Sequence, residues 1–363
     1  MSDVLILGYY GFRNSGDDAL LLSITEELRK QKEDIKITVL SKNPKETEKL
    51  YGVSAVKRDN IFSVLLKMIS CKVFVLGGGT LIQDGTSTKS LLYYLYMLRL
   101  CLFFGKKVML YANGIGPLAD KNIKITKKIL NKVDLITLRD KNSYDELEKI
   151  GVTKPRIILT ADSAFCLEYT NCKKLFEEKT KAGVPADNGY FIVSVRDHKR
   201  LPCDFVKTMS DACDYIHDKY GLNAVFMPFQ KSRDTEITNQ IRNMMKSESY
   251  EWDSESEISL LLNFIKEARL VVGMRLHSLI YAALVKVPEI GLVYDPKVQG
   301  FMEYMGQNQF EDAEKLSFPN LKKRIDFCFD NREKIIEELS INLDRMKELS
   351  KKNAEYLIKL LTE

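Results

Sequence analysis

Short apolar runs alternate along this chain with stretches that have helical periodicity. The first run, residues 4–7, ends at a glycine, and residues 17–30 then place Ala19, Leu20 and Ile24 on one side of a helix. Strands that alternate with helices in this way predict an α/β fold with mostly parallel sheets. The runs that we interpret as strands cover residues 4–7, 35–40, 53–56, 73–76, 107–111, 135–138, 157–160, 190–195, 224–227, 270–273 and 289–293.

The pattern occurs twice, which indicates two domains. A length of 363 residues is too great for one ordinary core. Residues 172–189 are charged and contain a Gly-Val-Pro break, as a linker does. We therefore predict an N-terminal domain over 1–171, a linker over 172–189, a C-terminal domain over 190–330, and a helix over 331–363 that can pack back on the first domain.

Charge and cysteine content exclude several classes of function. With 55 Lys and Arg against 50 Asp and Glu, the net charge of +5 is too small to indicate nucleic acid, although it suits an anionic substrate. The seven cysteines include no CxxC pair, and no His, Cys and Asp cluster has metal-ligand spacing. The N-terminus has no basic region or cleavage site of a signal peptide. We expect a cytoplasmic protein with reduced thiols, no metal and no nucleic-acid partner.

One apolar stretch, residues 91–104, allows two interpretations. It is too short to span a bilayer, and Arg99 interrupts it. It is either a helix buried under a sheet or a partly exposed patch that rests on a membrane.

In open parallel sheets, ligands bind beyond the carboxyl ends of the strands, and glycine-rich or charged loops follow several of the predicted strands. Residues 8–17 open the first helix, where free N–H groups attract anions, but the spacing is neither GxGxxG nor a Walker A loop. A glycine-rich turn with Asp17 in the first helical turn is the structural alternative. Gly77, Gly78 and Gly79 indicate either close backbone approach to a ligand or a tight turn.

The sharpest signal is the segment 273–278, which holds Arg275 and His277 just beyond a predicted strand. A histidine there is either structural or catalytic. Arg275 needs an anionic partner, and a bound phosphate or carboxylate would supply one. Lys297 follows another strand, and it either binds an anionic ligand or is a solvated turn residue. Arg139 either binds such a ligand or forms a salt bridge with Asp140 or Asp162.

Nine motifs follow one another along the chain: GYYGFRNSGDDA (8–19), GGGTLIQD (77–84), YANGIGP (111–117), ITLRD (136–140), TADSAF (160–165), SVRD (194–197), MPFQ (227–230), GMRLHS (273–278) and YDPKV (294–298). Together they resemble the polysaccharide pyruvyltransferase family, most closely its CsaB branch. Asp18 and Asn113 depart from the residues common in that family, which are Glu and Gln.

The resemblance implies a fold like that of GT-B glycosyltransferases, with two Rossmann-like domains around a cleft, the first on the acceptor side and the second on the donor side. It implies phosphoenolpyruvate as co-substrate, no further cofactor, and a 4,6-ketal as product. In the CsaB branch the acceptor is N-acetylmannosamine in a lipid-linked secondary cell-wall precursor, whose polymer anchors surface-layer proteins. Such an acceptor stays at the inner face of the membrane. The resemblance therefore favours the hypothesis that residues 91–104 make peripheral contact with the membrane.

The resemblance also assigns roles to residues. His277 becomes the catalytic acid and base, with Arg275 beside it. The donor-binding residues are Arg275, Lys297, Ser278 and Arg139. The candidates for hydrogen bonds to the acceptor sugar, all on loops of the first domain, are Asn14, Asp17, Gly78, Gly79, Gln83 and Asp84.

Two other functions compete with this one. A nucleotide-sugar glycosyltransferase of the same fold would bind a nucleoside diphosphate in the second domain, although no obvious ribose-binding Glu follows the right strand. A non-catalytic glycan-binding protein would not need Arg275, His277 and Lys297 together at strand ends.

Overall fold

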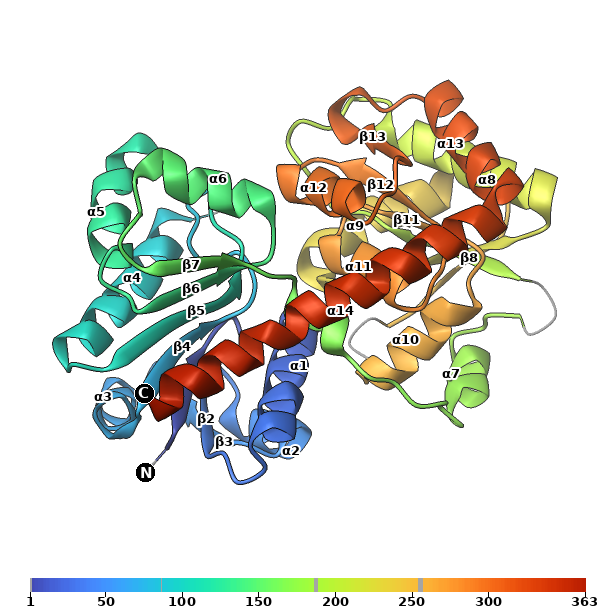
Figure 1. Cartoon of the computed structure of the whole chain (residues 1–363). Helices are drawn as coiled ribbons and strands as arrows, with labels where there is room; N and C mark the ends of the chain where they lie inside the picture. The colour runs from blue at the N-terminus through green and yellow to red at the C-terminus, as the bar shows by residue number, and fades with distance from the viewer. Residues whose placement is uncertain (1, 86, 186–188, 254–256) are drawn as a thin grey trace. The chain divides into compact units, whose positions relative to one another are not determined.

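The computed structural model describes residues 2–85, 87–185, 189–253 and 257–363. Its contacts divide the chain into two compact units. Unit 1 runs to Leu167 and includes Arg345–Glu363, and unit 2 is Glu168–Asp344. Each unit has a parallel sheet of its own with helices around it (Figure 1). The predicted linker 172–189 falls within unit 2, where it contains helix α7 (Leu175–Lys181).

The described residues of unit 1 form a seven-stranded parallel sheet in the order β3-β2-β1-β4-β5-β6-β7. The order reverses between β1 and β4, which makes this pair the topological switch point of the sheet. The strands are β1 (Val4–Leu7), β2 (Ile37–Ser41), β3 (Ser54–Lys57), β4 (Val73–Gly77), β5 (Lys107–Asn113), β6 (Leu135–Leu138) and β7 (Arg156–Leu159).

Two apolar clusters cover the two faces of this sheet. One cluster joins the strands to α3, α4, α5 and α6. The other joins them to α1 and to the end of α14, with Tyr51 at the end of α2 against it. These helices are α1 (Ser15–Gln31), α2 (Pro44–Tyr51), α3 (Ile61–Ser70), α4 (Thr88–Phe103), α5 (Asp120–Leu130), α6 (Lys141–Ile150) and α14 (Arg332–Thr362).

Unit 2 repeats the plan with six parallel strands in its described residues, in the order β10-β9-β8-β11-β12-β13. Its order reverses between β8 and β11. The strands are β8 (Tyr190–Ser194), β9 (Asn223–Phe226), β10 (Ser249–Glu251), β11 (Val271–Gly273), β12 (Glu289–Val293) and β13 (Phe310–Asp312).

The helices of unit 2 form two groups. Helix α8 contacts α9 and α13, whereas α11 contacts α10 and α12. Their bounds are α8 (Phe205–Tyr220), α9 (Lys231–Met244), α10 (Ile258–Glu267), α11 (Leu276–Leu284), α12 (Pro296–Tyr304) and α13 (Phe318–Asp330).

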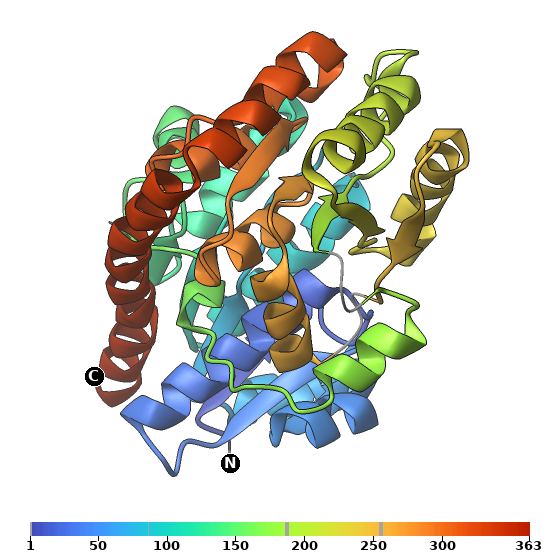
Figure 2. The ribbon, with the colours of Figure 1, turned by 90° about the vertical axis from the view of Figure 1, so that its right-hand side faces the viewer.

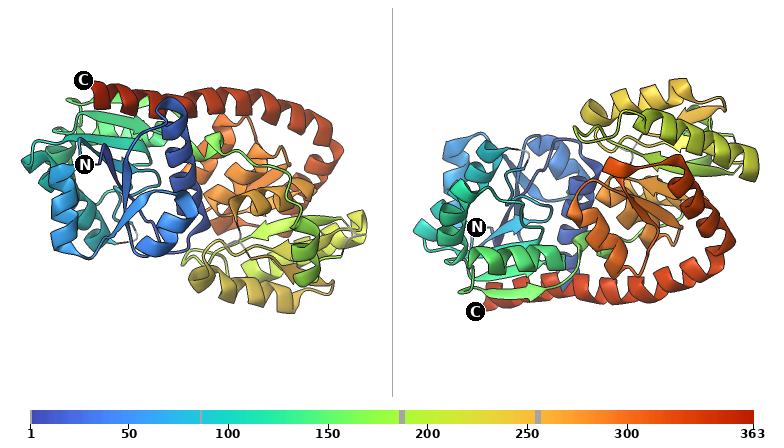
Figure 3. Two further views of the ribbon diagram at one scale, coloured as in Figure 1. Left: turned by 90° about the horizontal axis from the view of Figure 1, so that it is seen from below. Right: turned by 90° about the horizontal axis from the view of Figure 1, so that it is seen from above.

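Helix α14 is continuous (Figure 2), and its last part belongs to unit 1. There the side chain of Asn353 accepts a hydrogen bond from Thr160 Oγ1 at 2.8 Å and donates to the carbonyl of Ala161 at 3.1 Å. Leu357 and Leu360 join the apolar cluster that contains α1. Both ends of the chain therefore lie at unit 1 (Figure 3).

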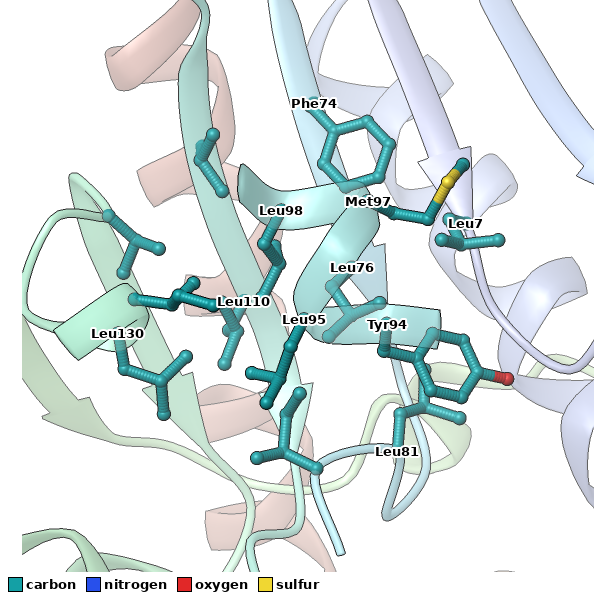
Figure 4. Close-up of a cluster of buried hydrophobic side chains, with 14 of the residues drawn as sticks. Leu7, Phe74, Leu76, Leu81, Tyr94, Leu95, Met97, Leu98, Leu110 and Leu130 are labelled. Carbon is teal, nitrogen blue, oxygen red and sulfur yellow. The ribbon is translucent and has the colours of Figure 1, made fainter. Parts of the chain in front are cut away.

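Helix α4 contains the apolar stretch that allowed two interpretations. Figure 4 shows its side chains Tyr94, Leu95 and Leu98 among those of the strands, including Leu76 and Leu110, and all of them are buried. The stretch is therefore a core helix on this side, as the first interpretation predicts. Its opposite side is exposed. In the described part of the chain, no helix is long and apolar enough to cross a membrane.

Candidate functional site

Each unit carries two of the nine motifs at the switch point of its own sheet. In unit 1 the loops that leave β1 and β4 hold residues 8–14 and 78–84, and in unit 2 those that leave β8 and β11 hold residues 195–198 and 274–275. At a switch point the connections leave neighbouring strands in opposite directions, so the carboxyl ends of those strands border an open crevice. The motifs therefore lie where parallel sheets bind ligands.

The glycines of unit 1 make room for one aromatic side chain. Tyr10 is fully buried and donates its hydroxyl proton to the carbonyl of Gly77 at 2.8 Å. A Cβ added at Gly8 would lie 2.4 Å from the Tyr10 ring, and one at Gly77 would lie 2.7 Å from its hydroxyl. Side-chain packing thus explains these two glycines.

Gly78 and Gly79 follow with left-handed backbone, at φ values of 58° and 74°. Asn113 is buried and donates from Nδ2 to the carbonyls of both, at 3.1 and 3.3 Å. A Cβ at Gly79 would lie 3.3 Å from the Asp17 carboxylate. The structure thus brings Asp17 to Gly79, so these two acceptor candidates are close together. Asn14 caps α1, accepting from Gly16 N at 3.1 Å.

Asp84 has a structural task. Its carboxylate accepts from the backbone N–H of Ala119 at 2.9 Å and from Asn122 Nδ2 at 2.5 Å, at the start of α5. These bonds fix the turn after the glycine loop to the next helix. Gln83, in the same loop, is partly exposed and remains a candidate for contact with a ligand.

Arg139 is buried in unit 1 among protein partners. Its Nη1 donates to Asp162 at 2.8 Å and its Nη2 to Thr80 Oγ1 at 2.8 Å, while Nε lies 3.5 Å from Asp140. A Cβ at Gly114 would lie 2.5 Å from Thr80 Oγ1 and 3.2 Å from Arg139 Nη2. These contacts are those of the salt-bridge alternative, and they make Arg139 a connector of the loops after β4, β5, β6 and β7.

In unit 2 the guanidinium of Arg275 meets an acid that the sequence did not indicate. Arg275 caps α11, and its Nε donates to Asp234 Oδ2 at 3.1 Å while Nη2 donates to Oδ1. Asp234, near the start of α9, is fully buried and also accepts from the backbone N–H of Gln230 at 2.9 Å. The anionic partner that Arg275 requires is thus supplied by the protein.

Ser278 and His277 follow in the first turn of α11. Ser278 is buried and donates its hydroxyl proton to the carbonyl of Arg275 at 2.6 Å, which ties its side chain to the start of the helix. His277 is partly buried, and its ring lies 6.1 Å from that of Tyr281. The histidine therefore lies at the switch point of unit 2, two residues beyond the Arg275–Asp234 pair.

Arg196 and Lys297 lie beside Tyr294, just beyond β12, and the charge of Arg275 also acts on this tyrosine. Arg196 Nη1 donates to the hydroxyl of Tyr294 at 3.0 Å, and Lys297 Nζ lies 5.8 Å from the Tyr294 ring and 3.1 Å from Asp295. Burial raises the pKa of the Tyr294 hydroxyl, but the charges of Lys297, Arg196 and Arg275 outweigh burial, so the net pKa is lowered. The three cations therefore favour a negative charge at the Tyr294 hydroxyl, although Asp295 opposes them.

Three buried polar atoms at the end of β8 and in the loop that follows it have no hydrogen-bond partner among the described residues. They are Ser194 Oγ, Arg196 Nε and His198 Nδ1. The His198 ring lies 5.4 Å from that of Tyr294. Because buried polar groups in native proteins are nearly always paired, three such atoms in five residues indicate a place for a ligand or bound water.

Sequence reasoning did not select Arg196, His198, Asp234 or Tyr294 as site residues. Arg196 and Tyr294 stand in the motifs SVRD and YDPKV, so a signal for them was present. Asp234 stands in the polar run 231–236, which has no such signal. Across the described residues, no three His, Cys, Asp or Glu side chains group as metal ligands.

Comparison with known proteins extends over the whole chain. The amylovoran biosynthesis protein AmsJ of Erwinia amylovora is 20% identical, over 96% of this chain and 97% of AmsJ. Among solved structures, Anabaena HepE in complex with UDP-glucose has a TM-score of 0.67 at 12% identity, covering 100% of both chains. The MnaA–UDP structure from S. aureus has a TM-score of 0.67 at 10% identity, covering 100% of this chain and 98% of MnaA.

A glycosyltransferase from Rickettsia africae is also similar, with a TM-score of 0.65 at 13% identity over 100% of this chain and 99% of that one. Likeness at such identities concerns the fold, and it confirms the predicted α/β fold of the GT-B type. The model of the polysaccharide pyruvyl transferase family matches residues 14–296, which is more than half of the chain. This chain therefore belongs to the polysaccharide pyruvyl transferase family.

Proposed function

We propose that this enzyme transfers pyruvate from phosphoenolpyruvate to two hydroxyls of a sugar as a 4,6-ketal, in the manner of the CsaB branch. The acceptor we propose is N-acetylmannosamine in a lipid-linked precursor of a secondary cell-wall polymer that anchors surface-layer proteins. Membership of the family supports pyruvyl transfer to a polysaccharide. The observation that carries the choice of donor is the cationic cluster of Arg196, Arg275 and Lys297 around Tyr294 in unit 2.

Phosphoenolpyruvate fits this cluster because it carries a carboxylate and a phosphate close together. Arg196 has one guanidinium nitrogen bonded to Tyr294, and its buried Nε has no acceptor among the described residues. Lys297 keeps donors beyond its bond to Asp295, since an ammonium group has three. We assign these two cations to direct contact with the donor. Arg275, held by Asp234, contributes its charge and positions α11.

The chemistry needs one proton to move to carbon. A proton delivered to the methylene carbon of phosphoenolpyruvate turns that carbon into a methyl group and leaves an oxocarbenium-like centre at C2. One sugar hydroxyl adds to C2, phosphate leaves with its bonding electrons, and the second hydroxyl adds. Of the two hydroxyl protons, one balances the proton given to carbon and the other leaves with phosphate. We assign these transfers to His277, because histidine is the side chain that most often serves as a general acid and base.

Unit 1 is the proposed acceptor side. Asp17, Gly79 and Gln83 offer carboxylate, backbone and amide groups at its switch point, with Asn14 and Gly78 beside them. Arg139, Asp84 and Ser278, which the resemblance places among the binding residues, instead have protein partners that suit a positioning role. We therefore assign them to the support of the loops.

Incubation of the enzyme with phosphoenolpyruvate and a lipid-linked N-acetylmannosaminyl acceptor tests the proposal. We expect phosphate release and an acceptor that gains the mass of a pyruvyl ketal. A His277→Gln variant is expected to lose turnover at least about a hundredfold, as for loss of a general acid. The matched control is His217→Gln, on α8, whose ring contacts the carbonyl of Leu222.

Two results would contradict the proposal. Transfer of a hexose from UDP-glucose to the acceptor, with phosphoenolpyruvate inert, would identify a nucleotide-sugar glycosyltransferase. Binding of the glycan without any turnover of either donor would identify a glycan-binding protein. Near-normal turnover by the His277 variant would remove that residue from the catalytic role while leaving the donor in place.

A further inference from the structure

Helix α3 of unit 1 exposes a stripe of large apolar side chains. Phe62, Leu66 and Ile69 recur at helical spacing and are 73%, 52% and 52% exposed, and Ile61 beside them is 75% exposed. The opposite side of α3 holds the buried Val64 and Met68. The helix is thus apolar on both sides, although only one side packs on its own sheet.

Helix α4 has a second stripe of the same kind. Leu92, Tyr96 and Phe103 are 42%, 58% and 80% exposed, and Arg99 lies in register between them. These positions alternate with the buried side chains that Figure 4 shows against the sheet. Exposed apolar residues scattered singly are ordinary, but two stripes at helical spacing are not.

The two stripes belong to one surface. Buried residues of α3 and α4 join the same apolar cluster on the same face of the unit 1 sheet, so the outer sides of both helices point away from that face. Arg58, just before α3, lies 4.8 Å from the ring of Tyr93 on α4. We call the outer sides of α3 and α4 together the α3–α4 face. Figure 1 shows both helices on the unit 1 sheet.

Charge is distributed unevenly around this face. Helices α3 and α4 contain three basic residues, Lys67, Lys89 and Arg99, and no acid. Lys89 and Arg99 are exposed and form no ion pair with the described residues. The face is therefore both apolar and cationic.

We propose that the α3–α4 face docks on an anionic lipid bilayer. Phe62, Leu66 and Phe103 would enter the boundary between headgroups and acyl chains, while Lys89 and Arg99 would contact lipid phosphates, as in interfacial amphipathic helices. A second copy of the chain is a poorer occupant. A two-fold interface would set this cationic face against itself, with no acid on α3 or α4 to neutralise it.

Membrane docking goes beyond the transferase reaction and does not depend on it. If the acceptor is lipid-linked, which rests on the proposed function, docking would hold the enzyme where its acceptor lies. The two ideas fail separately, because vesicles without any substrate test docking, and a soluble sugar acceptor tests turnover.

Co-sedimentation of the full chain with vesicles tests the proposal, using phosphatidylglycerol vesicles against phosphatidylcholine vesicles. We expect binding to the anionic vesicles that weakens with salt, and little binding to the neutral ones. Phe62→Glu with Phe103→Glu should reduce binding about tenfold or more, because it adds charge where apolar surface would be buried. The matched control is Phe176→Glu with Ile341→Glu, at positions of unit 2 that are 68% and 66% exposed.

Three outcomes would overturn the proposal. They are no binding to anionic vesicles, equal loss of binding in the test and control variants, and a wild-type dimer that the Phe62 and Phe103 changes convert to a monomer in sedimentation velocity. The last outcome would assign the face to a second copy. Circular dichroism and turnover on a soluble acceptor must match the wild type in each variant, so that misfolding does not imitate loss of docking.

Discussion

Arg275 and Asp234, from different elements of unit 2, form a buried ion pair in which Arg275 Nε donates to Asp234 Oδ2 at 3.1 Å. The Asp234 side chain is wholly buried, whereas 13% of the Arg275 side chain is exposed. Removal of the arginine therefore leaves a carboxylate with neither its main partner nor water, and such losses cost about 3–5 kcal/mol. Removal of the acid leaves a cation that can still turn toward solvent.

We predict that Arg275→Met lowers the free energy of unfolding of unit 2 more than Asp234→Asn does. The double variant should lose less free energy of unfolding than the two single variants lose together. Urea denaturation followed by fluorescence of Trp252 measures this, because Trp252 is the only tryptophan in the chain and is stacked on Phe264 in unit 2. Arg233→Met, an exposed change on α9, is the control. Additive losses would show that the pair is not coupled.

Tyr294 supplies a spectroscopic test of where the donor binds. The positive charges of Lys297, Arg196 and Arg275 outweigh burial and lower the pKa of its hydroxyl. A bound anion would cancel part of that positive potential, so we predict that phosphoenolpyruvate raises the pKa of Tyr294. Lys297→Met should raise it as well and should weaken the effect of phosphoenolpyruvate.

The measurement is the tyrosinate absorbance of the enzyme minus that of a Tyr294→Phe variant as pH rises. At a pH well below the folded pKa the hydroxyl is protonated in the folded and unfolded states, so the lowered pKa adds no stability there. The contribution to stability grows only as pH rises through the lowered folded pKa toward the unfolded value of about 10. If phosphoenolpyruvate leaves the titration of Tyr294 unchanged, the donor binds elsewhere.

The central strands were predictable because they are buried on both faces and appear in the sequence as continuous apolar runs. The strand β1 at Val4–Leu7 and the strand β6 at Leu135–Leu138 have the predicted bounds. The edge strands β10 and β13, with sequences SYE and FED, are only partly buried and have no apolar run. Pairing with a neighbour, which no local pattern encodes, makes them strands.

The site was predictable in its place but not in its partners. Arg275 and His277 lie at the carboxyl end of β11, as the pattern of strand and loop predicts. Asp234 pairs with Arg275 across 41 positions of sequence, and Arg196 reaches Tyr294 across 98. These meetings depend on the strand order around the switch point, which the hydrophobic pattern does not contain.

The contacts of Arg139 in unit 1 allow a prediction about the binding of the two substrates. The Arg139 guanidinium donates to Asp162 and Thr80, and these neighbours leave no room for a side chain at Gly114. Lysine keeps the charge but cannot make both bonds. We predict that Arg139→Lys and Gly114→Ala each raise the KM for the acceptor several-fold more than the KM for phosphoenolpyruvate. A larger effect on phosphoenolpyruvate would restore Arg139 to the donor site.

The buried side chain of Glu289 allows us to predict how the stability of unit 2 depends on pH. It begins β12, its side chain is fully buried, and neither carboxylate oxygen has a hydrogen-bond partner among the described residues. Burial alone raises the pKa of this carboxyl well above its ordinary value. Above the unfolded value of about 4.3, the folded state therefore binds more protons than the unfolded state.

Stability of unit 2 must then fall as pH rises, by up to about 1.4 kcal/mol per pH unit, until the raised folded pKa is reached. Glu289→Gln removes this dependence, because the amide stays neutral in both states. We predict that the variant matches the wild type near pH 4 and exceeds it in free energy of unfolding near pH 8, with Trp252 fluorescence in urea as the measurement. Glu236→Gln, on the exposed side of α9, should leave the wild-type slope intact. Equal slopes for the wild type and Glu289→Gln would mean that a partner ionises and stabilises this carboxylate in the folded protein.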